Sequence, residues 1–178
     1  MTAPKLDVIG VGNAIVDVLA EADDAFLARH KIPKGGMLLI DEAEARAIYD
    51  GMGPGREVSG GSAANSIACV ASLGGRGGFV GKVADDALGD IFRHDLRSLG
   101  VAFDTAPLAD GLGTGRCLIN VTPDAQRSMT TFLGAAGFVT VDDIDPAFIE
   151  SGAILFFEGY LFEQADPRRA FVKACDVA

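Results

Sequence analysis

The sequence is poor in the features that mark several common classes of protein. Its 178 residues include only three cysteines and two histidines, and 25 acidic residues outnumber 15 lysines and arginines, for a formal net charge of −10. Because basic side chains form no cluster, we expect no binding to nucleic acid or to a membrane surface. No apolar run approaches the length of a membrane span, and the N-terminus lacks the basic and then apolar pattern of a signal peptide. These absences predict a cytoplasmic protein.

The cysteines and histidines give no sign of a metal centre or a disulfide framework. Cys69, Cys117 and Cys175 are odd in number, scattered and set among apolar residues, which predicts buried thiols in a reducing compartment. His30 and His94 lie in helical patterns without a partner at ligand spacing, so we assign them no role. The composition, 49% hydrophobic and 22% charged, is that of an ordinary globular chain long enough for one core.

A pair of glycines stands at the entrance to a predicted helix. Gly60 and Gly61 precede Ser62, whose hydroxyl is a good N-cap for a helix from about residue 63 to residue 73. Asn65, on the first turn, offers a donor and an acceptor to a polyol. Paired glycines also suit a hinge, because they absorb large backbone changes at little steric cost. A plain turn before a core helix of small residues is the alternative.

A second motif follows the first predicted strand. Residues 5–12 are mostly apolar and end in glycines, but Ile15 stands where a dinucleotide-binding fingerprint needs its third glycine. The next residues alternate as a strand, so that Asn13, Ile15 and Asp17 point to one side. An amide and a carboxylate placed in this way can bind two adjacent hydroxyls. A turn asparagine and a surface aspartate are the alternative.

Together with a third motif, these residues resemble one enzyme family. The motifs are GNAIVD at 12–17, GGSAANSI at 60–67 and GKVADDALG at 81–89. In order and separation they are similar to those of the ribokinase (PfkB-type) family of carbohydrate and nucleoside kinases. The resemblance extends from about the fifth residue to the end of the chain. Sugar kinases of the family usually carry a small residue at the place of Ile67 and a glycine at that of Ala84, and the second motif is closer to adenosine kinases.

The resemblance implies both a fold and an activity. The fold is α/β, a doubly wound parallel-sheet core of the ribokinase type with a small β-sheet lid. The activity is ATP- and Mg²⁺-dependent phosphorylation of an adenosine-like ribonucleoside or a related sugar at its primary hydroxyl, in purine salvage. A ribose- or fructose-type sugar kinase and a non-catalytic module that binds a nucleoside or a sugar are the alternatives. The expected partner is a small molecule, and the sequence indicates no oligomeric state.

The resemblance also assigns a substrate site. The predicted substrate-binding residues are Asn13, Asp17, Gly60, Gly61, Ser62, Asn65, Arg127, Met129, Thr131 and Tyr160. The resemblance implies that Asn13, Asp17 and Asn65 hold the ribose with the backbone of Gly60 and Gly61, and that Ser62 lies in the same wall. Residues 37–40, Met129, Thr131 and either Tyr160 or Phe162 flank the base. Plain core packing is the alternative for the apolar members. Arg127 matches an arginine that can swing toward the transferred phosphate, with a solvated turn arginine as the alternative.

The catalytic machinery of the family has no counterpart in this sequence. Its glycine-rich anion loop, its aspartate base and its metal-associated Asn…Glu motif belong to the second half of the fold. The chain therefore resembles the N-terminal portion of such a kinase, with the general base expected beyond Ala178 and the ATP and Mg²⁺ sites mostly outside the chain. A helical pattern without a stop signal from residue 167 onward favours this interpretation.

The expected helices and strands divide the chain into two parts. Lid strands are expected within about 14–58 and 115–133, and the core within 5–13, 59–114 and 134–178. Helices are predicted at 23–29, 41–49, 63–73 and 86–99, and strands at 36–40, 78–81, 116–120, 128–133 and 153–157.

Two segments near the C-terminus carry expectations of their own. The apolar strand at 153–157 is predicted to be fully buried and to end at the edge of the sheet where open α/β sheets bind ligands. The charged run 142–145 is predicted to be a solvated cap ahead of Pro146, without a part in the chemistry.

Overall fold

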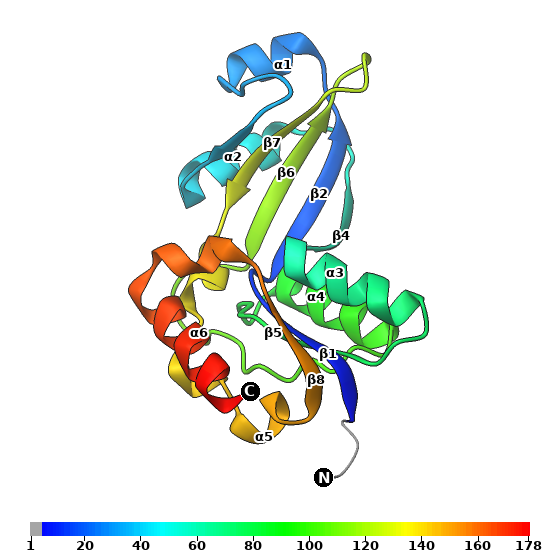
Figure 1. The fold of residues 1–178 in the computed structure, drawn as a ribbon. Coiled ribbons are helices and arrows are strands. Elements are labelled where there is room, and N and C mark those ends of the chain that lie inside the picture. The colour runs from blue at the N-terminus through cyan, green and yellow to red at the C-terminus, as the bar shows by residue number, and fades with distance from the viewer. Residues whose placement is uncertain (1–4) are drawn as a thin grey trace.

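A computed structural model describes residues 5–178, and its strands form two sheets (Figure 1). A parallel sheet of three strands has the order β5-β1-β8, and a mixed sheet of five strands has the order β3-β7-β6-β2-β4. The strands are β1 (Leu6–Val11), β2 (Ile15–Glu21), β3 (Met37–Leu39), β4 (Arg56–Gly60), β5 (Gly77–Val80), β6 (Gly115–Val121), β7 (Arg127–Phe132) and β8 (Gly152–Phe157). The helices are α1 (Asp24–Arg29), α2 (Glu42–Gly51), α3 (Ser62–Ser72), α4 (Ala87–Ser98), α5 (Pro146–Ile149) and α6 (Ala165–Val177), with the 3-10 helices η1 (Gly134–Phe138), η2 (Val141–Asp143) and η3 (Gly159–Glu163).

Strand β1 forms the centre of the parallel sheet, and its side chains alternate between two cores. Val8 packs toward the cluster that contains Ile67 of α3, whereas Ile9 and Val11 join the cluster that contains Phe171 of α6. β5 pairs with one side of β1 and β8 with the other, so the strand order reverses at β1. Open α/β sheets bind ligands at the carboxyl ends of strands beside such a reversal. The predicted α/β fold with a parallel core sheet is confirmed.

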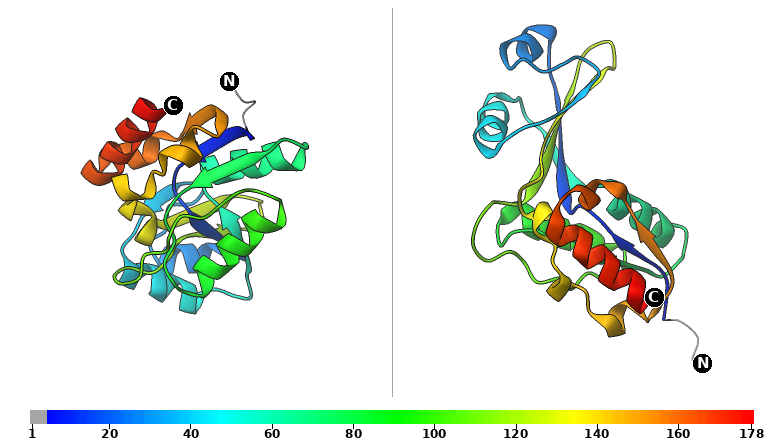
Figure 2. Two further views of the ribbon diagram at one scale, coloured as in Figure 1. Left: turned by 90° about the horizontal axis from the view of Figure 1, so that it is seen from below. Right: turned by 60° about the vertical axis from the view of Figure 1, so that its left-hand side comes forward.

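The mixed sheet stands above the parallel sheet in Figure 1, with helices on one face. In the right-hand view of Figure 2, α1 and α2 lie on the same side of this sheet. Val18 of β2, Phe26 of α1 and Ile48 of α2 belong to one buried cluster there. No described helix covers the other face, where Met37 and Leu39 of the edge strand β3 are 53% and 58% exposed.

Four crossings of the described chain connect the two sheets, and a glycine lies at each of them. The crossings contain Gly12 between β1 and β2, Gly60 at the end of β4, Gly115 at the start of β6 and Gly134 after β7. A Cβ at Gly115 would lie 2.4 Å from the backbone oxygen of Leu133, and one at Gly134 would lie 2.2 Å from another backbone oxygen. The last two crossings are therefore packed backbone against backbone.

Aspartate N-caps begin three helices where the sequence predicts them. Asp23, Asp41 and Asp86 accept hydrogen bonds from amides in the first turns of α1, α2 and α4. Asp41 and Glu44 complete a capping box, in which each side chain accepts from the other residue's amide. These helix starts are confirmed. They could be predicted because a cap is a signal confined to a few neighbouring residues.

Strand β8 is not fully buried, and the prediction was wrong on this point. Ile154 and Phe156 are 59% and 39% exposed, while Leu155 and Phe157 pack against the cluster that includes α6. β8 lies at the edge of the parallel sheet, and the described chain leaves its second face open. An apolar run predicts that a strand is covered, but it does not say which segment covers it.

Two of the three cysteines are exposed, which also corrects the prediction. Cys69 lies on α3 and Cys175 on α6, both toward solvent, and only Cys117 in β6 is buried. Apolar neighbours in sequence predict burial poorly on a helix, because adjacent residues lie on different sides of it.

The charged run at 142–145 is not merely a solvated cap. Asp143 forms an ion pair with Lys82, and the two side chains are only 7% and 11% exposed. Asp143 also accepts a 2.9 Å hydrogen bond from the amide of Thr140. The pair joins η2 to the segment that follows β5, a connection that the spacing of the charges could not predict.

Candidate functional site

A cavity of about 320 Å³ lies between the open face of the mixed sheet and the carboxyl ends of β1 and β8. Its polar end contains Asn13, Ser62 and Glu158, and its apolar end contains Leu39 and Leu133. The full lining is Asn13, Ile15, Met37, Leu39, Gly61, Ser62, Thr131, Leu133, Glu158, Gly159, Tyr160, Glu163 and Gln164. This size and this mixture are typical of sites for small molecules.

Asn13 follows β1 at the point where the strand order reverses, and only 5% of it is exposed. Its backbone amide donates to Glu158. Its side-chain oxygen Oδ1 is buried, and no group of the described residues donates a hydrogen bond to it. A buried acceptor without a partner costs about 1–3 kcal/mol, so this atom suits a donor supplied by a ligand.

Glu158 holds the polar end of the cavity together. Its buried carboxylate accepts hydrogen bonds from the backbone amide of Asn13, the hydroxyl of Ser62 and, at 3.0 Å, the amide of Ala63. A Cβ at Gly12 would lie 2.7 Å from its carboxyl carbon. Glu158 therefore joins β8 to the segment after β1 and to the start of α3.

These contacts correct the prediction that Ser62 is the N-cap of its helix. α3 begins at Ser62 with Gly61, which has no side chain to accept a hydrogen bond, in the cap position. Glu158 was not among the predicted site residues. The available signal was a charged residue directly after an apolar strand, at the edge where ligands bind.

Gly60 and Gly61 let two other groups approach the backbone closely. A Cβ at Gly60 would lie 2.5 Å from the carboxylate of Asp17. Gly61 has φ +100°, and a Cβ there would lie 2.3 Å from the backbone oxygen of Asn13. An alanine at Gly61 would be strained in this conformation, so it cannot serve as a neutral test of the hinge. The hinge remains a prediction.

Asp17 lies beside the cavity, on the face of β2 that also carries the cavity-lining Ile15. It stands opposite Cys117 in the neighbouring strand. Burial raises the pKa of Asp17, and the positive charge of Arg127 partly offsets this effect. Burial also raises the pKa of the Cys117 thiol. No hydrogen bond from the described residues contributes to the pKa of Asp17, which leaves its carboxylate available to a ligand.

The structure brings most of the predicted site residues to the cavity or directly beside it. Those that line the cavity are Asn13, Gly61, Ser62, Thr131 and Tyr160. Asp17 and Gly60 lie directly beside it. Met129 and Arg127 share one face of β7 with Thr131, but they lie farther from the polar end of the cavity. Asn65 is exposed on α3 and does not line the cavity.

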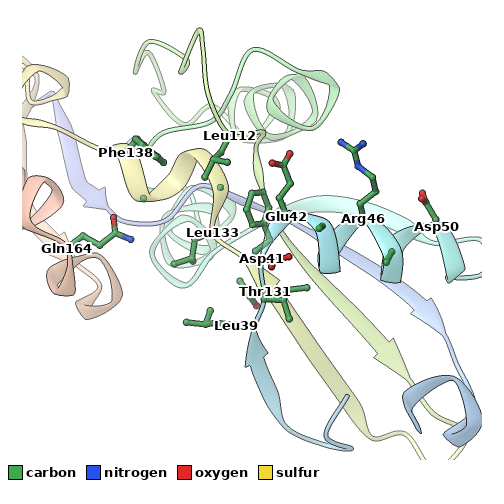
Figure 3. A pocket seen from close by; sticks show the side chains of 16 residues that line it. Leu39, Asp41, Glu42, Arg46, Asp50, Leu112, Thr131, Leu133, Phe138 and Gln164 are labelled. Carbon is green, nitrogen blue, oxygen red and sulfur yellow. The ribbon is translucent and has the colours of Figure 1, made fainter. Parts of the chain in front are cut away.

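A larger groove of about 990 Å³ adjoins the cavity (Figure 3). The residues that line both are Leu39, Thr131, Leu133 and Gln164. From α2, on one side, the side chains of Glu42, Arg46 and Asp50 project in a row, and Leu112 and Phe138 lie across from them (Figure 3). The sequence offered no signal for this groove, because its walls come from distant segments.

None of the helices within residues 5–178 has the length and hydropathy of a membrane span. Within the same range, no group of three or more histidine, cysteine, aspartate or glutamate side chains could hold a metal ion.

Known proteins resemble this chain in sequence. Residues 52–178 match the profile of a family described as pfkB family carbohydrate kinase. An adenosine kinase from Saccharomyces cerevisiae is 29% identical over 170 residues, which are 90% of this chain and 48% of that protein.

Solved structures resemble it more closely. The crystal structure of adenosine kinase from Sinorhizobium meliloti is 47% identical, with a TM-score of 0.89, and the match covers 98% of this chain and 53% of that one. A probable sugar kinase from Rhizobium etli is 41% identical, with a TM-score of 0.90 and the same coverage. The chain therefore spans about half the length of these relatives, and the predicted ribokinase-like fold is confirmed.

Proposed function

The chain belongs to the pfkB family of carbohydrate kinases, and from this premise we propose that it binds the substrate of an ATP- and Mg²⁺-dependent nucleoside kinase. The proposed substrate is an adenosine-like ribonucleoside, phosphorylated at its primary hydroxyl. Two of the similar proteins, from S. cerevisiae and S. meliloti, are adenosine kinases, and the second is 47% identical. These similarities support the choice of a nucleoside.

The buried side chain of Asn13 is the observation that carries the proposal. Its Oδ1 atom faces no donor among the described residues, and a ligand hydroxyl in the cavity would supply one. Asp17 is half-buried beside the cavity, and no hydrogen bond from the described residues contributes to its pKa. Two adjacent hydroxyls, as on a ribose, would satisfy both side chains.

The apolar end of the cavity supports a flat base rather than a sugar alone. Met37, Leu39 and Leu133 give the cavity apolar walls, and Tyr160, which is 71% exposed, also lines it. A sugar of the ribose or fructose type would leave this surface uncovered. The similarity to a probable sugar kinase keeps that substrate class as the second candidate.

We place the sites for ATP and Mg²⁺ mostly outside this chain. The described part of the chain has no cluster of metal-ligating side chains, and we assign it no general base. We propose that these groups belong to the half of the relatives that has no counterpart here. When bound, Mg²⁺-ATP supplies the phosphoryl group and neutralises its charge. The residues of this chain hold and orient the nucleoside.

Calorimetry on the chain tests the proposed binding. Adenosine should bind more tightly than 2′,3′-dideoxyadenosine or ribose. Asp17→Asn should weaken adenosine binding by about 1.5–3 kcal/mol, the contribution of a charge-assisted hydrogen bond. Asp110→Asn, at an exposed residue outside the cavity, is the matched control. Equal affinities for adenosine and its dideoxy analogue would contradict the assignment of Asn13 and Asp17.

A chimera separates a kinase from a non-catalytic binding module. In it, this chain replaces the matching 53% of the S. meliloti adenosine kinase. The chimera should consume ATP only when adenosine is present, and Asp17→Asn should abolish most of this activity, whereas the chain alone should transfer no phosphate. Adenosine binding without turnover in a folded chimera would favour the binding module.

A further inference from the structure

The cavity and the groove share part of their lining, and the shared residues do not include those of the polar end of the cavity. Their common wall is formed by Leu39, Thr131, Leu133 and Gln164. Asn13, Ser62 and Glu158, at the polar end, do not line the groove. The wall includes the Leu39 side chain, which is 58% exposed and lies on the short edge strand β3. A ligand held at the polar end and long enough to reach Leu39 would point its opposite end toward the groove.

The groove combines an apolar side with a charged side. Leu112 and Phe138 are 37% and 46% exposed and lie across from α2 (Figure 3). Glu42, Arg46 and Asp50 are spaced four residues apart on α2, so they share one side of the helix. An occupant that contacts both sides needs an apolar part against Leu112 and Phe138 and a polar group where it meets α2.

The charge of the groove selects the sign of that polar group. None of the ion pairs between described residues involves Glu42, Arg46 or Asp50. Asp41 also lines the groove, so three carboxylates stand against a single guanidinium. The net charge of −10 for the whole sequence acts in the same direction. A cationic group is therefore favoured over a neutral or anionic one.

We propose that the groove binds the distal part of a ribonucleoside whose base carries a flexible apolar arm ending in an ammonium group. This inference rests on the proposed function, because the ribose must lie at Asn13 and Asp17 for the base to reach Leu39. The arm passes Leu39 and Leu133, covers Leu112 and brings its ammonium to the α2 carboxylates. The site thus accepts nucleosides that are larger than adenosine at the edge of the base.

Calorimetry with four ligands tests this proposal: adenosine, N6-hexyladenosine, N6-(6-aminohexyl)adenosine and N6-(5-carboxypentyl)adenosine. The hexyl arm should tighten binding at least about tenfold over adenosine, because it covers apolar surface in the groove. The ammonium should add a further gain of about two- to fivefold, typical of exposed charge pairs, and the carboxylate should weaken binding by a similar factor. Extended ligands that bind no more tightly than adenosine would overturn the proposal.

Variants on α2 locate the effect. Ala47→Trp, at an exposed residue that lines only the groove, should remove the gain from every arm and leave adenosine binding unchanged. Ala87 on α4 is exposed and lines neither the cavity nor the groove, so Ala87→Trp is the control. The double substitution Glu42→Gln and Asp50→Asn should remove only the preference for the ammonium.

Each outcome of these measurements decides one proposal. If Ala47→Trp does not fold, as judged by circular dichroism, Ala43→Phe fills the same groove. An arm that still tightens binding in a folded, groove-filled variant would overturn the inference and leave the proposed function intact. Failure of adenosine itself to bind, or an affinity insensitive to Asp17→Asn, would overturn the proposed function and this inference with it.

Discussion

The substitution Glu158→Gln is expected to destabilise the chain through a conflict of hydrogen-bond donors. In the native structure one carboxylate oxygen, Oε1, accepts from the amide of Asn13, and the other, Oε2, accepts from Ser62 and from Ala63. A glutamine replaces one oxygen with an NH₂ group. A hydroxyl can rotate to accept from that group, but a backbone amide cannot. Whichever way the new amide turns, one backbone N–H then faces another donor.

The magnitude follows from the bonds that change. One charge-assisted bond, of about 1.5–3 kcal/mol, is lost, and the remaining bonds fall to the neutral strength of about 0.5–1.5 kcal/mol. We therefore expect a loss of about 2–4 kcal/mol in the free energy of unfolding. The same change should weaken adenosine binding, because Asn13 and Ser62 lose their common anchor.

Urea unfolding followed by far-ultraviolet circular dichroism measures this loss. Glu163→Gln changes the net charge equally at an exposed residue and is the matched control. The control should stay within about 0.5 kcal/mol of the unsubstituted chain, as is usual for surface changes. A Glu158→Gln variant as stable as the control would refute the argument that this carboxylate holds the three segments together.

Four further predictions concern stability. Gly61→Ala should cost at least about 2 kcal/mol, because its φ of +100° is unfavourable for alanine; an unchanged urea midpoint would contradict this. Lys82→Met should lower the free energy of unfolding by about 3–5 kcal/mol, because it leaves the buried Asp143 without its partner. Asp143→Asn on that background should recover part of this loss, and urea unfolding can measure both changes. Burial opposes ionisation of Asp86, but its hydrogen bonds outweigh this effect and lower its pKa below 3.8. The contribution of Asp86 to the free energy of unfolding is therefore present above pH 3.8 and is lost as the pH falls through the folded pKa. Asp86→Asn should reduce this acid sensitivity, which pH-dependent unfolding can measure. Burial raises the pKa of Asp17, so its ionised form destabilises the unliganded chain, and Asp17→Asn should raise the free energy of unfolding at pH 7 while it weakens adenosine binding.

Features that depend on neighbouring residues could be predicted from the sequence. The capping box of α2 needs only Asp41 and Glu44, and the hairpin of β6 and β7 is formed by segments that follow each other closely. The alternation of β2 likewise placed Ile15 and Asp17 on one face. Each of these signals lies within one or two elements, so the rest of the fold does not change it.

Features that join distant segments could not be predicted in the same way. Glu158 contacts Asn13 and Ala63 across 145 and 95 residues of sequence. Its carboxylate replaces the local capping expected of Ser62, because a buried anion is a stronger acceptor than a hydroxyl. The pair of Lys82 and Asp143, 61 residues apart, was missed for the same reason. Such contacts depend on which strands become neighbours in the sheet, and no short segment of the sequence indicates this.

The pairing of the mixed sheet also determines the order in which the molecule can assemble. β2 lies parallel to β6, with Ile15 opposite Gly115, so the centre of the sheet forms only after a very long loop has closed. β3 pairs with β7 alone, and it has no partner until that strand has been made. During synthesis β2 can pair early with β4, but its other edge and all of β3 must wait for β6 and β7, which leave the ribosome much later. Because non-local pairing slows folding and exposes strand edges, we expect this sheet to form late and to depend most on protection from aggregation.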